Sequence, residues 1–81
     1  MKEFPVKTPQ QFGSILQGFR RDQNLTQQAV GAKVGLAQNA ISNVEADSGT
    51  TSVARLFKVL AALDLELVVR PRRQENKSSE W

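Results

Sequence analysis

The chain has 81 residues, 40% of them hydrophobic and 23% charged, and eleven Lys and Arg against eight Asp and Glu give a net charge of +3. This length predicts one small domain that is marginally stable alone, so a second copy or another partner is an expected source of stability, and the mild positive charge permits a polyanionic partner. The absence of Cys and His excludes the usual zinc sites and catalytic triads, and we expect no enzyme activity, catalytic residue, metal, cofactor or small-molecule substrate.

Residues 1–7 are predicted to form an N-terminal arm, and a helix is predicted from residue 8 to about residue 23. Thr8 can cap this helix, Pro9 suits its first position, and Gln11 stands three residues after the cap, as in a capping box. We expect the helix to pack through one apolar face, because a stripe at helical spacing follows. That stripe consists of Phe12, Ile15, Leu16 and Phe19.

Two short helices joined by a tight turn are predicted next. The first covers residues 27–34 after the capping residue Thr26 and ends at Gly35, and the second runs from Ala37 to about Glu45. Two short helices with a turn of about three residues have the geometry of a helix-turn-helix. Their expected inward residues are Val30, Val34, Ile41 and Val44.

A fourth helix is predicted from Ser52 to about Leu63, because apolar residues again recur at helical spacing. We expect it to complete the core of a small helical bundle. Its expected buried residues are Val53, Leu56, Phe57, Leu60 and Leu63.

The segment after this helix alternates between apolar and polar residues, which predicts a strand over residues 65–70 before Pro71 ends it. Leu65, Leu67 and Val69 share one side of this strand. Since no other segment has strand character, the expected partner is the same strand of a second copy, and residues 65–71 are predicted to serve dimerisation. The alternative is a frayed continuation of the fourth helix.

Residues 72–81 form a polar tail without an apolar period, which predicts disorder in the isolated chain. Trp81 ends this tail and is the only tryptophan in the chain. One interpretation is an aromatic anchor for a pocket of a protein partner, and the other is an incidental terminal residue.

The string from Leu25 to Glu45 closely resembles the Xre/Cro/C1-repressor family. Thr26-Gln27 opens the second helix, a small residue and a turn glycine stand at the family's spacing, and the third helix ends with the family's Ile-Ser-x-apolar-Glu pattern. The resemblance covers roughly residues 10–64. It implies a mainly α, lambda-repressor-like helix-turn-helix domain of four to five helices that binds DNA, over residues 8–64. The remaining matched residues are Gly31, Gly35, Gln38 and Ile41-Ser42-Asn43-Val44-Glu45.

Polar residues on the third helix, which is the recognition helix of this family, are predicted to contact DNA bases. Gln and Asn can bond bidentately to adenine, so we expect at least one A·T pair in each half-site. An ordinary solvated helix face is the alternative. The chain departs from the family at Ala37, which offers no side-chain cap, and at Asn43, where many relatives carry Arg. The predicted base-contacting residues are Gln38, Asn39, Ser42 and Asn43.

Phosphate contacts are predicted for Arg20, Arg21 and Lys33, with solubilising surface charge as the alternative. The resemblance adds Gln27, which would contact a phosphate and brace Gln38. Because phosphate neutralisation supplies most non-specific affinity, a homodimer with about six such cations should bind better than a monomer. Two-fold symmetry then predicts a double-stranded operator built as an inverted repeat, with half-sites roughly 34 Å apart.

A narrower resemblance, to HipB-type antitoxins, appears at both ends of the domain. It is carried by Thr8-Pro9-Gln10-Gln11, by Ala40-Ile41-Ser42-Asn43, by the leucine-rich fourth helix running into Leu65-Glu66-Leu67, and by the closing Glu80-Trp81. This resemblance implies that the C-terminal strands of two subunits pair. It also implies a HipA-like serine/threonine kinase toxin as partner and repression of the protein's own operon, in a type II toxin–antitoxin pair.

Other functions remain open at this point. A stand-alone Cro-like regulator without a toxin partner is the main alternative, and a pure interaction module is another. An enzyme is the weakest hypothesis, because no carboxylate belongs to a catalytic motif. No apolar run approaches the roughly 20 residues of a membrane-spanning helix, and the missing cysteines fit a reducing compartment, so a cytoplasmic, nucleoid-associated protein is expected.

Overall fold

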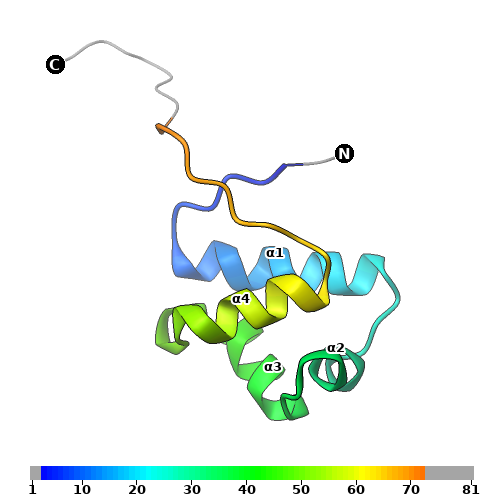
Figure 1. Cartoon of the computed structure of the whole chain (residues 1–81). Helices are drawn as coiled ribbons and strands as arrows, with labels where there is room; N and C mark the ends of the chain where they lie inside the picture. Colours follow the sequence, from blue (N-terminus) through cyan, green and yellow to red (C-terminus); the bar gives the residue numbers. More distant parts are fainter. Residues whose placement is uncertain (1–2, 73–81) are drawn as a thin grey trace, which may run out of the picture.

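The computed structural model describes residues 3–72, which contain four α-helices and one 3-10 turn (Figure 1). The predicted mainly helical fold with a helix-turn-helix is therefore confirmed. The α1 and α4 helices form the upper layer in Figure 1, and α2 and α3 lie below them. In chain order the elements are α1 (Pro9–Asp22), α2 (Gln27–Val34), α3 (Gln38–Ala46), η1 (Ser48–Thr50) and α4 (Val53–Ala62).

The helices begin where the sequence supplies capping side chains. Thr8 forms the predicted capping box, since its Oγ1 accepts from the Gln11 N–H at 3.2 Å while the Gln11 side chain accepts from the Thr8 N–H. Thr26 caps α2 and Ser52 caps α4 in the same way. At α3 the residue in this position is Ala37, which makes no side-chain cap, so no capping side chain accepts from the first backbone N–H groups of α3.

Three helices end in the same backbone motif, in which a residue with positive φ follows the last helical turn. These residues are Asn24, Gly35 and Asp64, with φ of 60°, 72° and 60°. After α4 the Leu65 N–H donates to the Leu60 carbonyl at 2.8 Å, which closes the helix. The chain therefore leaves α4 at a sharp turn and does not continue as a frayed helix.

The core is built from one face of each helix and contains Leu16, Val30, Ile41, Val44, Val59, Leu60, Ala62 and Leu63. Two glycines bring backbones close enough that no side chain fits. A β-carbon at Gly13 of α1 would overlap the Glu45 carbonyl oxygen of α3, and one at Gly31 would overlap the Leu36 carbonyl oxygen. These contacts fix how closely α1 approaches α3 and how tightly the helix-turn-helix turn folds back on α2.

Two residues expected in the core are at the surface instead. Val53 and Phe57 of α4 are 67% and 52% exposed. Leu56, Val59, Leu60 and Leu63 occupy the inward face of α4, and at 100° per residue Val53 and Phe57 lie on a neighbouring face that no other described element covers. The prediction that they are buried is therefore wrong for a single chain.

The segment 65–70 has no β-sheet partner within residues 3–72, so the predicted strand is not formed there. Leu65 packs against the core, whereas Leu67 and Val69 are 49% and 91% exposed. The physical reason is that a lone strand can pair only with another chain. The predictions for residues 73–81, including Trp81, lie outside the described residues.

The N-terminal arm runs beside this C-terminal segment at the top of the molecule (Figure 1). The ring of Phe4 meets that of Phe19 edge to face, with centroids 5.5 Å apart. Glu3 and Arg70 form an exposed ion pair at 3.2 Å. The two ends of the described chain are thereby held next to each other, on the side of the molecule away from α3.

Candidate nucleic-acid interface

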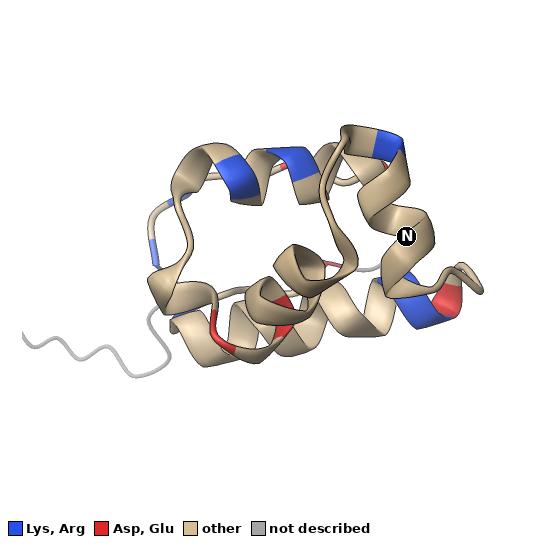
Figure 2. Ribbon diagram, turned by 90° about the horizontal axis from the view of Figure 1, so that it is seen from below, with Lys and Arg blue, Asp and Glu red and all other residues tan. Residues whose placement is uncertain are grey.

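The helix-turn-helix presents one polar, uncharged face of α3 to solvent. Gln38, Asn39 and Asn43 are exposed and Ser42 is half-buried, so all four predicted base-contacting residues are accessible to solvent. Figure 2, viewed from below, shows α3 between α4 on one side and α1 on the other. Because nothing in the described structure covers this face of α3, it is free to enter a groove.

Ala46 belongs to the same face and was missed by the sequence analysis. It is exposed at the C-terminal end of α3, three residues after Asn43, four after Ser42 and seven after Asn39. That spacing places it on the same side of the helix, and the spacing alone could have identified it. A methyl group at this position contributes apolar surface next to three polar side chains.

A chain of hydrogen bonds connects this face to the interior. The Gln38 Nε2 donates to the Gln27 Oε1 at 3.5 Å, as the family resemblance implied, and the Gln27 Nε2 donates to the Glu45 Oε1 at 3.1 Å. Gln27 begins α2 and Glu45 lies near the end of α3. The Gln27 side chain therefore connects the first residue of α3 to its last turn.

Arg20 completes this chain from α1 and is not a surface cation. Its Nε donates to the Glu45 Oε2 at 2.6 Å, its Nη2 to Oε1 at 3.2 Å, and its Nη1 to the Leu25 carbonyl at 2.8 Å. The side chains of Arg20 and Glu45 are only 10% and 4% exposed. All three guanidinium nitrogens thus donate inside the protein, so we withdraw Arg20 as a phosphate contact and assign it to the fold.

The amino-acid sequence contains an indication of the buried Arg20–Glu45 ion pair. Glu45 stands four residues after Ile41 and directly after Val44, which are both buried, so helical spacing turns its carboxylate inward. A buried carboxylate requires a compensating charge and hydrogen-bond donors. Arg20, at the end of the helix that packs on α3, is the residue in reach.

The exposed Lys and Arg side chains lie on the helices around α3, and α3 itself carries none. Figure 2 shows Lys and Arg on α4, at the end of α1 and on α2. Arg21 is exposed at the end of α1, and the exposed Lys33 directs its Nζ to the Ala62 carbonyl at 3.5 Å. Arg55 and Lys58 of α4, which the sequence analysis did not single out, are also exposed. The basic residues flank the polar face, as a duplex with its phosphates on both sides of a groove requires.

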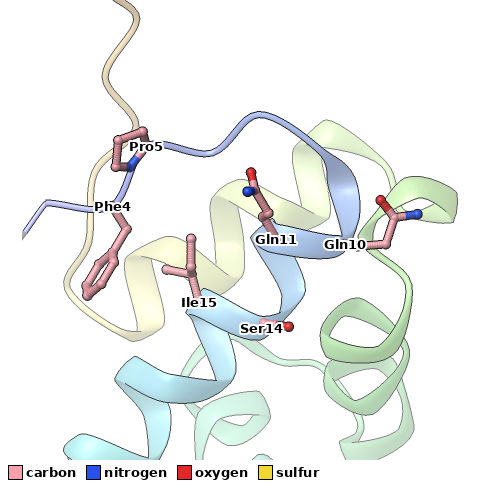
Figure 3. A pocket seen from close by; sticks show the side chains of 6 residues that line it. All are labelled: Phe4, Pro5, Gln10, Gln11, Ser14 and Ile15. Atoms are coloured by element: carbon pink, nitrogen blue, oxygen red, sulfur yellow. The ribbon is translucent and has the colours of Figure 1, made fainter. Parts of the chain in front are cut away.

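A separate hollow lies between the arm and the first turns of α1 (Figure 3), on a different part of the surface from α3. It is lined by the apolar side chains of Phe4, Pro5 and Ile15 and by Gln10, Gln11 and Ser14. None of these side chains is ionisable. Among residues 3–72 no three acidic side chains lie together in a way that would hold a metal ion, and no helix in that range is long and apolar enough to cross a membrane.

The chain is similar to known helix-turn-helix proteins in both sequence and structure. The helix-turn-helix family matches residues 16–69. Antitoxin HipB of Escherichia coli O6:H1 is 28% identical in an alignment that covers 94% of this chain and 87% of the relative. Two solved structures have similar folds, each with 25% identity over the whole of the solved chain. One is a complex of a HipB variant with an O2 20mer, with a TM-score of 0.85 and 89% of this chain covered. The other is a HipA–HipB–O2–O3 complex, with a TM-score of 0.84 and 88% covered.

Proposed function

Because this chain belongs to the helix-turn-helix family, we propose that it is a dimeric, sequence-specific DNA-binding repressor that reads its operator with α3. The observation that carries the proposal is the polar face of α3, which is exposed and uncharged and whose first residue, Gln38, is connected to the interior by the Gln38–Gln27–Glu45–Arg20 chain of hydrogen bonds. A base-reading surface must be accessible, and side chains that are oriented before binding read bases at a lower entropic cost. This face is exposed, and Gln38 is the residue on it that the structure orients, through Gln27.

In this proposal Gln38, Asn39, Ser42 and Asn43 contact base edges in the major groove. The amide side chains favour adenine, so at least one A·T pair is expected in each half-site. Ala46, at the end of the same face, suits contact with a thymine methyl group. The 3.5 Å bond between Gln38 and Gln27 favours one orientation of the Gln38 side chain before DNA binds, which lowers the entropy lost on binding.

Phosphate contacts come from Arg21, Lys33 and the start of α2 at Gln27, with Arg55 and Lys58 as further candidates on α4. Each subunit alone offers few cations, and non-specific affinity grows with the number of phosphates neutralised. A dimer doubles that number and presents two recognition helices. Its operator is therefore an inverted repeat with half-sites about one helical turn apart, roughly 34 Å.

The dimer is held in part by residues 65–70, which pair with the same segment of a second copy. Leu67 and Val69 are exposed in the single chain, and Leu65 fixes the start of the segment on the core. Pairing satisfies the backbone N–H and C=O groups along this segment, which have no β-sheet partner among residues 3–72.

The likeness to HipB over nearly the whole chain supports a second role, as the antitoxin of a type II toxin–antitoxin pair. The proposed partner is a HipA-like serine/threonine kinase toxin, with which the protein represses its own operon. Trp81 is the proposed anchor for this partner, on a tail outside the described residues. A stand-alone Cro-like regulator is the alternative, in which the C-terminal residues serve only the dimer.

DNA binding is tested by fluorescence anisotropy with labelled duplex from upstream of the protein's own gene. Asn39→Ala should weaken binding by about 1–3 kcal/mol, because it removes base contacts. Gln10→Ala is the matched control, since Gln10 is also an exposed amide on a helix but lies on α1, beside the hollow of Figure 3. Equal affinity of the wild type, Asn39→Ala and Gln10→Ala for this duplex would refute the proposal that α3 contacts the bases.

The toxin partnership is tested with a chain truncated after Arg73. Binding to a HipA-like serine/threonine kinase from the same host is measured by calorimetry, and operator binding is measured in parallel. Loss of kinase binding with unchanged operator binding supports the antitoxin role and the tail as its contact. If no kinase binds the full chain while the operator does, the Cro-like alternative holds.

A further inference from the structure

The hollow between the N-terminal arm and α1 has apolar walls that the described residues leave open to solvent (Figure 3). Phe4 and Pro5 of the arm lie on one side of it and Ile15 of α1 on the other. Its volume of about 470 Å³ is within the roughly 300–1,000 Å³ that small-ligand sites occupy. The hollow therefore suits a large apolar group with a polar atom at its edge. Its polar lining comes from Gln10, Gln11 and Ser14.

We propose that this hollow is the docking site of Trp81 of the same chain, which occupies it until a protein partner takes the tail. The inference rests on the proposed role of Trp81 as an anchor for a partner, and it adds the place where that anchor is held beforehand. An indole ring has a large apolar body and one N–H donor. It matches a hollow that combines apolar walls with side-chain oxygens.

The C-terminal segment passes close to this hollow before it leaves the described structure. Arg70 forms an ion pair with Glu3 at 3.2 Å, and Glu3 directly precedes Phe4 in the arm. Figure 1 shows this segment running beside the arm. The eleven residues that follow Arg70, up to Trp81, span at most about 36–40 Å when extended. Trp81 therefore reaches the hollow without full extension of the tail.

The composition of the tail selects Trp81 as the group that docks. Every residue between Arg72 and Trp81 is polar or charged, so Trp81 is the one apolar side chain that this stretch offers. Glu80, next to it, is opposite in charge to the exposed Lys7. Lys7 lies beside the hollow, since its backbone N–H donates to the Gln11 Oε1 at 2.6 Å.

The short connection favours the same chain over a second copy as the source of the ring. A short tether gives its end an effective concentration of the order of millimolar at a nearby site. A second copy at micromolar concentration competes poorly with that. The tail also lowers the apparent affinity of a partner for Trp81, because only the undocked fraction is free to bind it. A chain whose hollow no longer holds the ring should therefore bind its partner more tightly than the wild type.

The first test uses Trp81 as its own probe, because the chain has one Trp and no Tyr. Acrylamide should quench the fluorescence of the full wild-type chain at least about threefold less efficiently than that of Ile15→Ser, since a docked ring is exposed only in a minor state. Ile15 is half-buried and lies outside the core, so this change should leave the fold intact. Val6→Ser is the matched control, because Val6 follows Pro5 but does not line the hollow, and it should behave like the wild type.

Two outcomes of this test would overturn the inference. If the wild type and Ile15→Ser are quenched equally, the hollow does not hold Trp81. If Val6→Ser is quenched as strongly as Ile15→Ser, the effect is not specific to the hollow. Neither outcome decides whether Trp81 anchors a partner, because kinase binding is measured separately. Failure of this inference and failure of the proposed function are therefore distinguishable.

A second test identifies the contact and the chain that supplies it. Ile15 and Ile41 are the isoleucines of the chain, and Ile41 is fully buried in the core. In methyl-labelled protein, Trp81→Ser should move the Ile15 methyl resonance, because it removes a neighbouring ring, and should leave that of Ile41 unchanged. An unmoved Ile15 resonance would refute the docking. Unlabelled wild type added to labelled Trp81→Ser should not restore the wild-type position of Ile15, and restoration would show that the ring comes from a second copy.

Discussion

Replacing Arg20 with Met should lower the free energy of unfolding by much more than the loss of an exposed arginine would. The substitution removes three hydrogen bonds, two to the Glu45 carboxylate and one to the Leu25 carbonyl. The Glu45 side chain, 4% exposed, then stays buried with Gln27 as its remaining side-chain donor. A carboxylate left buried without its counter-charge is strongly destabilising.

The expected loss is about 3 kcal/mol. Removing one partner of a buried ion pair typically costs about 3–5 kcal/mol, and the lower value applies because Gln27 still donates to Glu45. A domain of this length has a free energy of unfolding of about 4–12 kcal/mol. The loss is therefore a large share of the total and corresponds to a decrease in Tm of roughly 12–24 °C.

The measurement is urea unfolding followed by circular dichroism at one fixed protomer concentration, since a dimer gains stability with concentration. Arg21→Met is the matched control, because Arg21 is the adjacent, exposed arginine, and it should change stability by less than about 0.5 kcal/mol. The double variant Arg20→Met/Glu45→Met should recover much of the loss, since it leaves no buried charge. Equal stability of the Arg20 and Arg21 variants would refute the structural role of Arg20.

Three further outcomes are expected. Gly13→Ala should destabilise the fold by about 1–3 kcal/mol, because its methyl group meets the Glu45 carbonyl, whereas Gly18→Ala, with open space around it, should stabilise α1 by about 0.5–1 kcal/mol. Thermal unfolding of the two variants checks this pair, and similar changes in both would contradict the close approach. Asp64→Gly should raise stability by about 0.5–1 kcal/mol, since its φ of 60° favours glycine, and unchanged stability in urea titrations would count against strain there. Arg21→Met should reduce the slope of log K against log salt by about 2 in operator binding, one phosphate for each subunit, and an unchanged slope would remove Arg21 from the interface.

The sequence predicts the helices well because their boundaries are local. Thr8, Thr26 and Ser52 each satisfy backbone N–H groups within three residues, and Gly35 ends α2 through its own backbone conformation. The outward residues of α3 follow from helical spacing in the same way, whereas its role as a recognition helix was predicted from the turn and the family resemblance. Base contacts by these residues remain a prediction until DNA binding is measured.

The errors of the sequence analysis concern contacts between distant segments or between chains. Arg20 stands in the last turn of α1, where periodicity does not tell a surface cation from the partner of a carboxylate 25 residues away. Val53 and Phe57 carry a helical apolar pattern, but the pattern does not say whether the neighbour is the same chain or another. The segment 65–70 has the alternation of a strand, and backbone pairing requires a partner that one chain does not contain.

Under the proposed function, the hydrogen bond between Gln38 and Gln27 distinguishes Gln38 from the other predicted base-contacting residues. A change at Gln38 removes the 3.5 Å bond to Gln27, whose side chain also donates to the buried Glu45, so we expect it to affect the contact between α2 and α3 as well as DNA preference. Within residues 3–72 the structure shows no hydrogen bond from the Asn39 or Asn43 side chains to the rest of the protein, so both can vary at little structural expense. New operator preferences should therefore evolve first at Asn39 and Asn43, and changes at Gln38 should require compensation at Gln27.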